Sequence, residues 1–250
     1  MPRIDGNYLD ISDCNINLYK IFSSKFGGLV GQDDFNKRGD IVLKMFKIIN
    51  EPFDEFYKWR GDSAEEFVYF NIGSRFKDLK WYGETVSLSG KKTFDMFNNE
   101  HFGAVLDFTY TDYIENETIS LEIKSKNIKD YEKIQKNGAQ NSHIAQAELA
   151  AYLGGYKKFN ILYIFFTDEQ EQMIKEAKES VLFSENELKT FMCRYEVNEE
   201  KIKLQMNEAW EYCFWVSQFK KIPLQDISEK SFKLLGIIPP NSGFAFRPII

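Results

Sequence analysis

Histidine and cysteine are scarce in this chain. The 250 residues include two histidines, His101 and His143, and three cysteines, Cys14, Cys193 and Cys213. Chemistry that needs several imidazoles is therefore excluded, and with it most zinc hydrolases. The cysteines are odd in number, far apart and free of any Cys-x-x-C pair, which argues against a disulfide framework, a zinc site or an iron–sulfur cluster. If the chain is an enzyme, carboxylates and lysines must carry the reaction.

Long apolar runs are also missing. The longest, Phe159 to Phe166, is about half of what a membrane span requires. The first residues, Met1-Pro2-Arg3-Ile4-Asp5, lack the apolar core of a signal peptide. We therefore expect a soluble, cytoplasmic protein with no membrane partner.

The charge balance is slightly acidic, with 32 Lys and Arg against 38 Asp and Glu and a net charge of −6. This balance argues against a protein that coats nucleic acid nonspecifically, although a local basic groove stays open because steering depends on the local potential. Hydrophobic residues make up 43% of the chain, and 23 Phe and 13 Tyr supply a large core. The composition is that of a globular protein and excludes a chain that is mostly disordered.

Hydrophobic periodicity predicts alternating helices and strands. A largely helical stretch is expected from Gly39 to Phe76, and within it the apolar residues from Ala64 to Phe76 recur at helical spacing behind a start at Asp62-Ser63. Two further expected helices are a buried one opened by Ser142 and ended by Gly154-Gly155 and a long one from Asn198 to Lys220. The expected strands are Trp81 to Ser89, His101 to Thr109, Thr118 to Lys126 and Phe159 to Phe166. This order predicts an α/β fold with a mixed central sheet flanked by helices. We expect one domain over residues 1–223 and an irregular tail over 224–250, packed on that domain.

The most informative segment is a candidate hairpin with polar residues on one face. Residues two apart in a strand share a face, so Glu122 and Lys124 point one way while Leu121 and Ile123 point into the core. Placing Asp107 opposite Glu122 brings their Cβ atoms to roughly 5 Å.

The same register pairs Tyr110 with Ile119 and Asp112 with Glu117. It leaves a loop from Tyr113 to Asn116, which is an ordinary hairpin length.

Two carboxylates that close repel each other unless a cation lies between them. Mg²⁺ prefers oxygen ligands, so Asp107, Glu122 and the backbone carbonyl of Ile123 are candidate ligands. Such an ion activates a bound water, and Lys124 would orient that water or neutralise developing charge. The pattern indicates hydrolysis of a phosphodiester.

The tripeptide Glu-x-Lys is by itself uninformative. It occurs again at Glu176/Lys178, Glu187/Lys189 and Glu199/Lys201, in polar segments where we expect these charged side chains to be exposed to solvent. Only Glu122/Lys124 lies on an apolar strand that follows another strand ending in Asp. The alternative interpretation is an edge strand with a solvated ion pair.

Six motifs in order resemble the PD-(D/E)XK nuclease superfamily and, within it, the phage lambda-type (YqaJ-like) alkaline exonucleases. The motifs are FSSKFGGLVGQDDF (22–35), RGDSAEEF (60–67), GAVLDF (103–108), LEIKSK (121–126), HIAQAELAAYLGG (143–155) and the closing helix with its terminal proline (197–223). The resemblance implies a restriction-endonuclease-like core and covers most of the chain.

The resemblance also assigns roles to residues. It implies Glu65, in a G-x-x-x-E helix motif, near the metal together with Asp107 and Glu122, and Gln146 as a support of the site or of DNA. Glu66 competes with Glu65, because a helix turns about 100° per residue and only one of them faces the site.

Three further residues are candidates for DNA binding. The resemblance implies Ser24 and Lys25 near a terminal phosphate, and Lys126 is a candidate to line a DNA groove. The chain departs from the family pattern with Phe108 where a glycine often follows the catalytic Asp, and with only Lys20 near the place of an early arginine.

The activity that the resemblance implies is a Mg²⁺-dependent DNA nuclease, with Mn²⁺ able to substitute. Its most specific form is a 5′→3′ exonuclease on double-stranded DNA in phage or mobile-element recombination. The resemblance further implies that such an exonuclease acts in the cytoplasm of a bacterial host, assembles as a homo-oligomer (trimer) and works with a single-strand annealing protein. Two alternatives are a structure- or sequence-directed endonuclease on the same fold and a catalytically dead DNA-binding or assembly protein.

Overall fold

The computed structural model describes the chain except for residues 34, 53, 83–95, 98 and 240–250. The strands are β1 (Arg3–Asp5), β2 (Tyr8–Asp10), β3 (Ile21–Phe22), β4 (Lys77–Trp81), β5 (Phe102–Gly103), β6 (Phe108–Thr111), β7 (Thr118–Asn127), β8 (Lys158–Phe166), β9 (Lys189–Glu196) and β10 (Lys221–Pro223). The α-helices are α1 (Ser23–Leu29), α2 (Arg38–Met45), α3 (Glu55–Phe67), α4 (Tyr131–Asn137), α5 (Asn141–Leu153), α6 (Asp168–Ala177), α7 (Glu199–Phe219) and α8 (Glu229–Leu235).

A mixed five-stranded sheet with the order β4-β6-β7-β8-β9 forms the centre of one part of the molecule. The middle strand β7 pairs antiparallel with β6 and parallel with β8. Every residue of β8 after Lys158 is buried, which requires both faces of the sheet to be covered.

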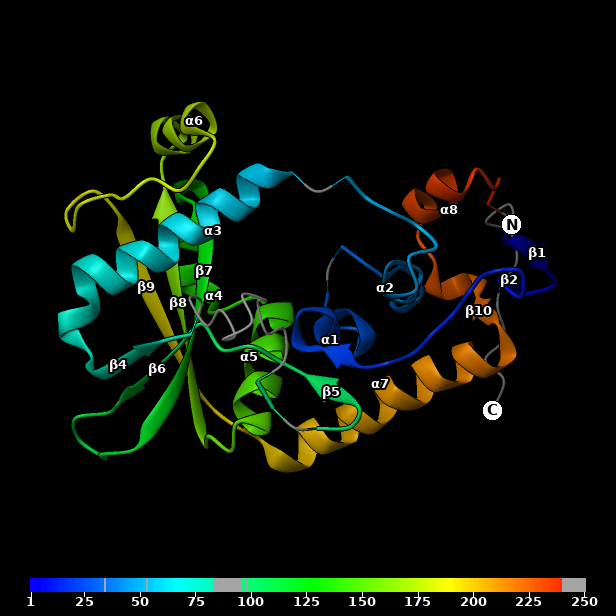
Figure 1. The fold of residues 1–250 in the computed structure, drawn as a ribbon, viewed down its shortest axis with the longest axis horizontal. Helices are drawn as coiled ribbons and strands as arrows, with labels where there is room; N and C mark the ends of the chain where they lie inside the picture. Colours follow the sequence, from blue (N-terminus) through cyan, green and yellow to red (C-terminus); the bar gives the residue numbers. More distant parts are fainter. Residues whose placement is uncertain (34, 53, 83–95, 98, 240–250) are drawn as a thin grey trace, which may run out of the picture.

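Helices cover the two faces of this sheet. Leu162 and Ile164 pack in a cluster with residues of α3 and α6, whereas Ile161 and Phe165 pack in a cluster with residues of α4 and α5. The prediction of an α/β fold with a mixed central sheet flanked by helices is confirmed (Figure 1).

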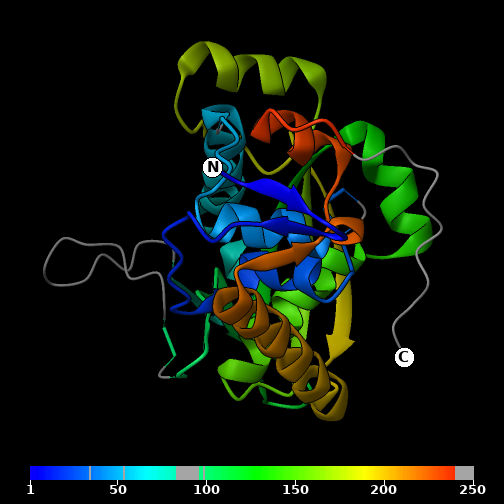
Figure 2. The same cartoon turned by 90° about the vertical axis from the view of Figure 1, so that its right-hand side faces the viewer.

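The other part of the molecule is built from α1, α2, α8 and two small sheets, and α7 runs beneath it from α5 to β10 (Figure 1). One small sheet has the order β1-β2-β10, so the first strands and a late strand lie side by side (Figure 2). The other pairs β3 with β5 in parallel. A second hydrophobic core joins these elements to α5 and α7.

Asp107 lies where the chain passes from one part to the other. The expected strand from His101 to Thr109 is wrong as a single element, because β5 pairs with β3 in the small sheet while β6 pairs with β4 and β7 in the central sheet. Residues 104–107 connect the two sheets. This connection places Asp107 at the junction of the two parts.

The expected start of the early helix at Asp62-Ser63 is also wrong. Helix α3 begins at Glu55, because the Asp54 carboxylate accepts the backbone N–H of Phe56 and caps the helix there. Ser63 lies inside the helix and its hydroxyl donates back to the Trp59 carbonyl.

Other boundaries agree with or correct the sequence analysis. Strands β7 and β8 and helices α5 and α7 are confirmed to within one or two residues. The strand expected over 81–89 starts earlier, at Lys77, and residues 83–89 lie outside the described residues. Helix α6 and strand β9 were not predicted, and the tail expected to be irregular contains α8.

Two helical glycines should respond oppositely to replacement by alanine. A Cβ on Gly39 would lie 2.5 Å from the carbonyl oxygen of Asp226, whereas a Cβ on Gly61 meets nothing within 4 Å. We expect Gly39→Ala to destabilise the fold by about 2 kcal/mol through overpacking and Gly61→Ala to stabilise it by about 0.5 kcal/mol through helix propensity. Urea unfolding of both variants measures the difference, and equal effects would contradict the close α2–Asp226 contact.

Candidate active site

The predicted hairpin register is confirmed. Phe108 pairs with Leu121 and Tyr110 with Ile119. The backbone N–H of Asp112 donates to the carbonyl of Glu117 at 2.9 Å, which closes the predicted loop. Because the β6–β7 pairing starts at Phe108 and Leu121, Asp107, the residue before Phe108, lies beside Glu122, as the predicted register requires.

Asp107 is held at this position through its carboxylate and its backbone. Its Oδ2 accepts the backbone N–H of Ile123 at 2.7 Å, and its carbonyl accepts the N–H of Tyr82 at 2.9 Å. Burial, and then the negative charges of Glu122 and Glu65, raise the pKa of Asp107 well above its usual value. The site therefore concentrates negative charge that a cation would relieve.

Three side chains from two elements form a hydrogen-bonded group, named here the triad (Glu122, Lys124 and Gln146). Lys124 Nζ donates to Glu122 Oε1 at 2.7 Å and to Gln146 Oε1 at 3.1 Å. Gln146 Nε2 donates to the same Glu122 oxygen at 2.7 Å. Strand β7 supplies the ion pair and helix α5 supplies the amide that bridges it, so the alternative of a solvated edge strand is wrong.

Lys124 keeps its charge although it is largely buried. Burial by itself would lower the pKa of Lys124, but the carboxylates of Glu122, Asp107 and Glu65 raise it above its usual value. Glu122 is only 5% exposed. A buried carboxylate with a charged lysine is a strong electrostatic arrangement because solvent screens it little.

The geometry distinguishes Glu65 from Glu66. Glu65 accepts the indole N–H of Trp81 at 3.0 Å, and its charge acts on both Asp107 and Lys124. Glu66 instead accepts the hydroxyl of Ser180 at 2.9 Å. Glu65 is therefore the helix carboxylate that faces the site.

The chemistry of the donors fits a hard divalent cation. Asp107 and Glu122 offer carboxylate oxygens, the preferred ligands of Mg²⁺, and their mutual repulsion favours a bound cation. Among the described residues, no group of three or more His, Cys, Asp or Glu side chains lies close enough together to hold a metal ion. The backbone contact seen for Ile123 is through its N–H, and its carbonyl stays a predicted ligand.

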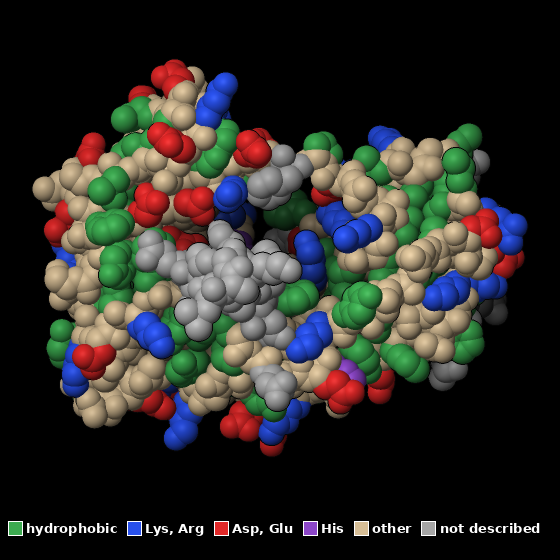
Figure 3. Space-filling view, viewed as in Figure 1, with side chains coloured by type: hydrophobic (Ala, Val, Ile, Leu, Met, Phe, Trp, Pro, Cys, Tyr) green, Lys and Arg blue, Asp and Glu red, His purple; other side chains and the backbone are tan. Residues whose placement is uncertain are grey.

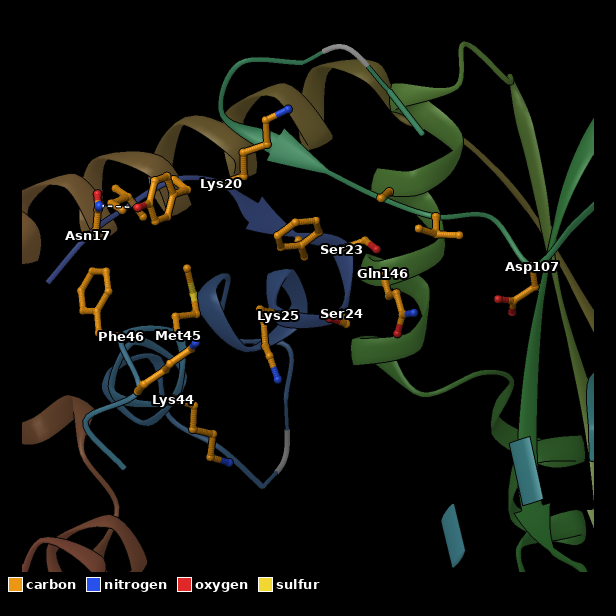
Figure 4. Close-up of a pocket in the computed structure, with 16 residues that line it drawn as sticks. Asn17, Lys20, Ser23, Ser24, Lys25, Lys44, Met45, Phe46, Asp107 and Gln146 are labelled. Atoms are coloured by element: carbon orange, nitrogen blue, oxygen red, sulfur yellow. Dashed lines mark hydrogen bonds between the residues drawn. The ribbon is translucent and has the colours of Figure 1, made fainter. Parts of the chain in front are cut away.

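A cavity of about 630 Å³ opens beside these residues between the two parts of the molecule. Asp107 and Gln146 line one end, and Ser24 and Lys25 of α1 line its side (Figure 4). Lys and Arg side chains gather beside a hollow between the two parts (Figure 3). The structure thus brings Ser24 and Lys25 to the same cavity as Asp107.

Lys126 lies outside the lining of this cavity. Its Nζ donates to Gln140 Oε1 at 3.1 Å, and burial, aided by Arg60 and Lys124, lowers its pKa.

Lys44, at the end of α2, and Lys47, just after it, also line the cavity and were not predicted from the sequence. Lys44 lies in the last turn of α2, whereas Lys47 follows the helix in a turn with a φ of 55°. Nothing in the sequence indicates that these two lysines are turned toward Asp107.

The other Glu-x-Lys tripeptides lie away from the site. Lys178 and Lys189 are exposed as expected. Lys201 is half-buried instead, because its Nζ forms an ion pair at 2.8 Å with the buried Glu148 of α5. This pair fastens α7 to α5.

Comparisons with known proteins identify the fold. No protein-family model and no curated protein match the chain. Solved structures do: the alkaline exonuclease LHK-Exo from Laribacter hongkongensis is 14% identical, with a TM-score of 0.50 over 81% of this chain and 91% of that chain. Its complex with dAMP is 15% identical, with a TM-score of 0.51 over the same shares.

A phage-related exonuclease from Haemophilus somnus 129PT is 14% identical, with a TM-score of 0.51 over 81% of this chain and 96% of that chain. The protein therefore has the α/β fold of the alkaline and phage-related exonucleases, and the resemblance read from its motifs is confirmed at the level of the fold. None of the described helices is long and apolar enough to cross a membrane.

Proposed function

We propose that this protein is a divalent-metal-dependent DNA nuclease, and in its most specific form a 5′→3′ exonuclease on double-stranded DNA. The observation that carries the proposal is the triad, with Asp107 beside it at the junction of the two sheets. The fold shared with alkaline exonucleases supports the same conclusion.

Asp107 and Glu122 would hold Mg²⁺ or Mn²⁺. Glu65 adds negative charge that acts on Asp107 and stays a predicted ligand, because these three carboxylates do not form a metal-holding group among the described residues. When bound, the metal supplies Lewis-acid activation of water and of the phosphoryl oxygen. The residues of the chain position the substrate and stabilise developing charge. Lys124 presents a fixed positive charge to the phosphate as negative charge develops there, and Gln146 keeps Glu122 and Lys124 in place.

The cavity supplies the binding surface for the substrate. Lys25, Lys44 and Lys47 line it together with the hydroxyl of Ser24, and cationic and hydroxyl groups of this kind bind backbone phosphates. DNA is thus the proposed partner. The resemblance adds a role in recombination, a trimeric assembly and a single-strand annealing partner to the proposal.

The test compares a linear 5′-phosphorylated duplex with a covalently closed circle, each with Mg²⁺, with Mn²⁺ and with EDTA. We expect metal-dependent loss of the linear DNA alone. Cutting of the circle would instead establish an endonuclease on the same fold. If neither DNA is degraded with either metal, the catalytic proposal fails and DNA binding without hydrolysis is the conclusion.

A further inference from the structure

Tyr163 and His143 form a hydrogen-bonded pair directly behind the triad. Tyr163 is fully buried on β8, and its hydroxyl lies 2.8 Å from Nδ1 of His143. The same hydroxyl accepts the backbone N–H of Gln140 at 3.3 Å. In the parallel pairing of β7 with β8, Tyr163 is the partner of Lys124. The pair therefore lies next to the lysine of the site.

The hydrogen-bonding capacity of the two side chains favours one position for the hydrogen that they share. A neutral imidazole has one donor and one acceptor nitrogen, and a tyrosine hydroxyl has one hydrogen to donate. Burial, and then the charges of Lys124 and Lys126, lower the pKa of His143 to about 2, so the ring is neutral. The Tyr163 oxygen accepts from Gln140, and the arrangement that also uses its buried hydrogen has the hydroxyl donate to Nδ1 and the imidazole carry its own hydrogen on Nε2. We expect this tautomer.

The pair fastens the first turn of α5 to the sheet. His143 and Gln146 are three residues apart on α5 and share a face. Gln140, just before the helix, is held by Tyr163 through its backbone and by Lys126 through its side chain. A shift of this turn would move the Gln146 amide, which contacts both other members of the triad.

We propose that Tyr163 and His143 are positioning residues, whose mutual hydrogen bond sets α5 against β7 and β8 and thereby keeps Gln146 bonded to Glu122 and Lys124. The catalytic consequence rests on the proposed function. The positioning itself is a property of the free protein and is testable without any reaction.

Tyr163→Phe tests the proposal, with Tyr195→Phe as the matched control. Tyr195 lies on the neighbouring strand β9, and its hydroxyl accepts the backbone N–H of Ala139 at 3.1 Å, one residue before Gln140. Each variant thus loses one tyrosine hydroxyl that accepts an N–H of the same loop. We expect Tyr163→Phe to lower kcat about tenfold with KM for DNA little changed, and Tyr195→Phe to leave kcat unchanged. Equal kcat values for Tyr163→Phe and the wild type would overturn the proposal.

A second measurement does not depend on activity. The chain has only two histidines, so ¹⁵N NMR of the metal-free protein resolves their tautomers, and a His143→Gln variant assigns them. We expect the Nε2–H form at His143, and a shift of the Gln146 side-chain amide signals in Tyr163→Phe but not in Tyr195→Phe. If the wild type hydrolyses no DNA, the proposed function fails while these signals still decide the positioning role. Gln146 signals that stay unmoved in Tyr163→Phe overturn it in either case.

Discussion

Replacing Lys124 by methionine should lower metal-dependent DNA hydrolysis by about 10²- to 10³-fold. The lysine is the one cation in the described triad, and the carboxylates around it raise its pKa and keep it charged. Methionine keeps an unbranched apolar stem that ends one atom short of Nζ, so it removes the charge and the hydrogen bonds while filling most of the same space. Gel assays on linear duplex DNA with Mg²⁺ measure the loss.

The same substitution also affects stability and needs a matched design. Removing one partner of a buried ion pair costs about 3 kcal/mol, because Glu122 keeps only its bond to Gln146. The double variant Glu122→Gln/Lys124→Met removes both charges and should recover stability without recovering activity. Lys189→Ala, in a second Glu-x-Lys on an exposed strand end, should leave hydrolysis unchanged.

Full hydrolysis by a folded Lys124→Met protein would place the chemistry elsewhere in the molecule. Loss of hydrolysis together with loss of DNA binding would assign Lys124 to binding rather than to the chemical step.

Asp107→Asn should abolish hydrolysis and at the same time stabilise the metal-free protein at neutral pH. Asp107 has a raised pKa in the folded state, because burial and the neighbouring Glu122 and Glu65 disfavour its charge. The folded state therefore binds more protons than the unfolded state, and stability falls as pH rises from the unfolded pKa, about 4, to the folded pKa. Asparagine carries no charge and can still accept the N–H of Ile123, so it should remove this part of the pH dependence.

Denaturant unfolding in EDTA across this pH range measures the effect. Asp112→Asn is the control at the other end of β6. Its pKa is lowered by the backbone N–H groups of Glu115 and Ile114, so its contribution is present above the unfolded pKa and is lost as pH falls. Added Mg²⁺ should stabilise the wild type but not Asp107→Asn. If Asp107→Asn were less stable than the wild type at neutral pH, this would contradict the claim that repulsion from Glu122 and Glu65 destabilises a charged Asp107 in the folded state.

Local patterns were sufficient for the elements that carry the triad. The alternation of Leu121, Glu122, Ile123 and Lys124 predicts the strand. A one-residue slip of the pairing would turn its apolar face to the other side, and the short loop before Glu117 sets the register among the pairings that remain. The expectation that Glu122 and Lys124 share a face is met in the structure, where both bond to Gln146. The strand pattern does not predict that the side chains of Glu122 and Lys124 both bond to Gln146.

By itself the sequence determined the α/β class, the central strands, the helix bearing Gln146 and the pairing that brings Asp107 beside Glu122, since periodicity and turn length act over short distances along the chain. Only the tertiary structure decided that Glu65 rather than Glu66 faces the site, that Lys44 and Lys47 line its cavity and that Tyr163 holds His143. Each of these facts depends on the packing of elements distant in sequence. Side-chain contacts across such distances are set by how whole layers pack together, and a local pattern carries no information about that packing.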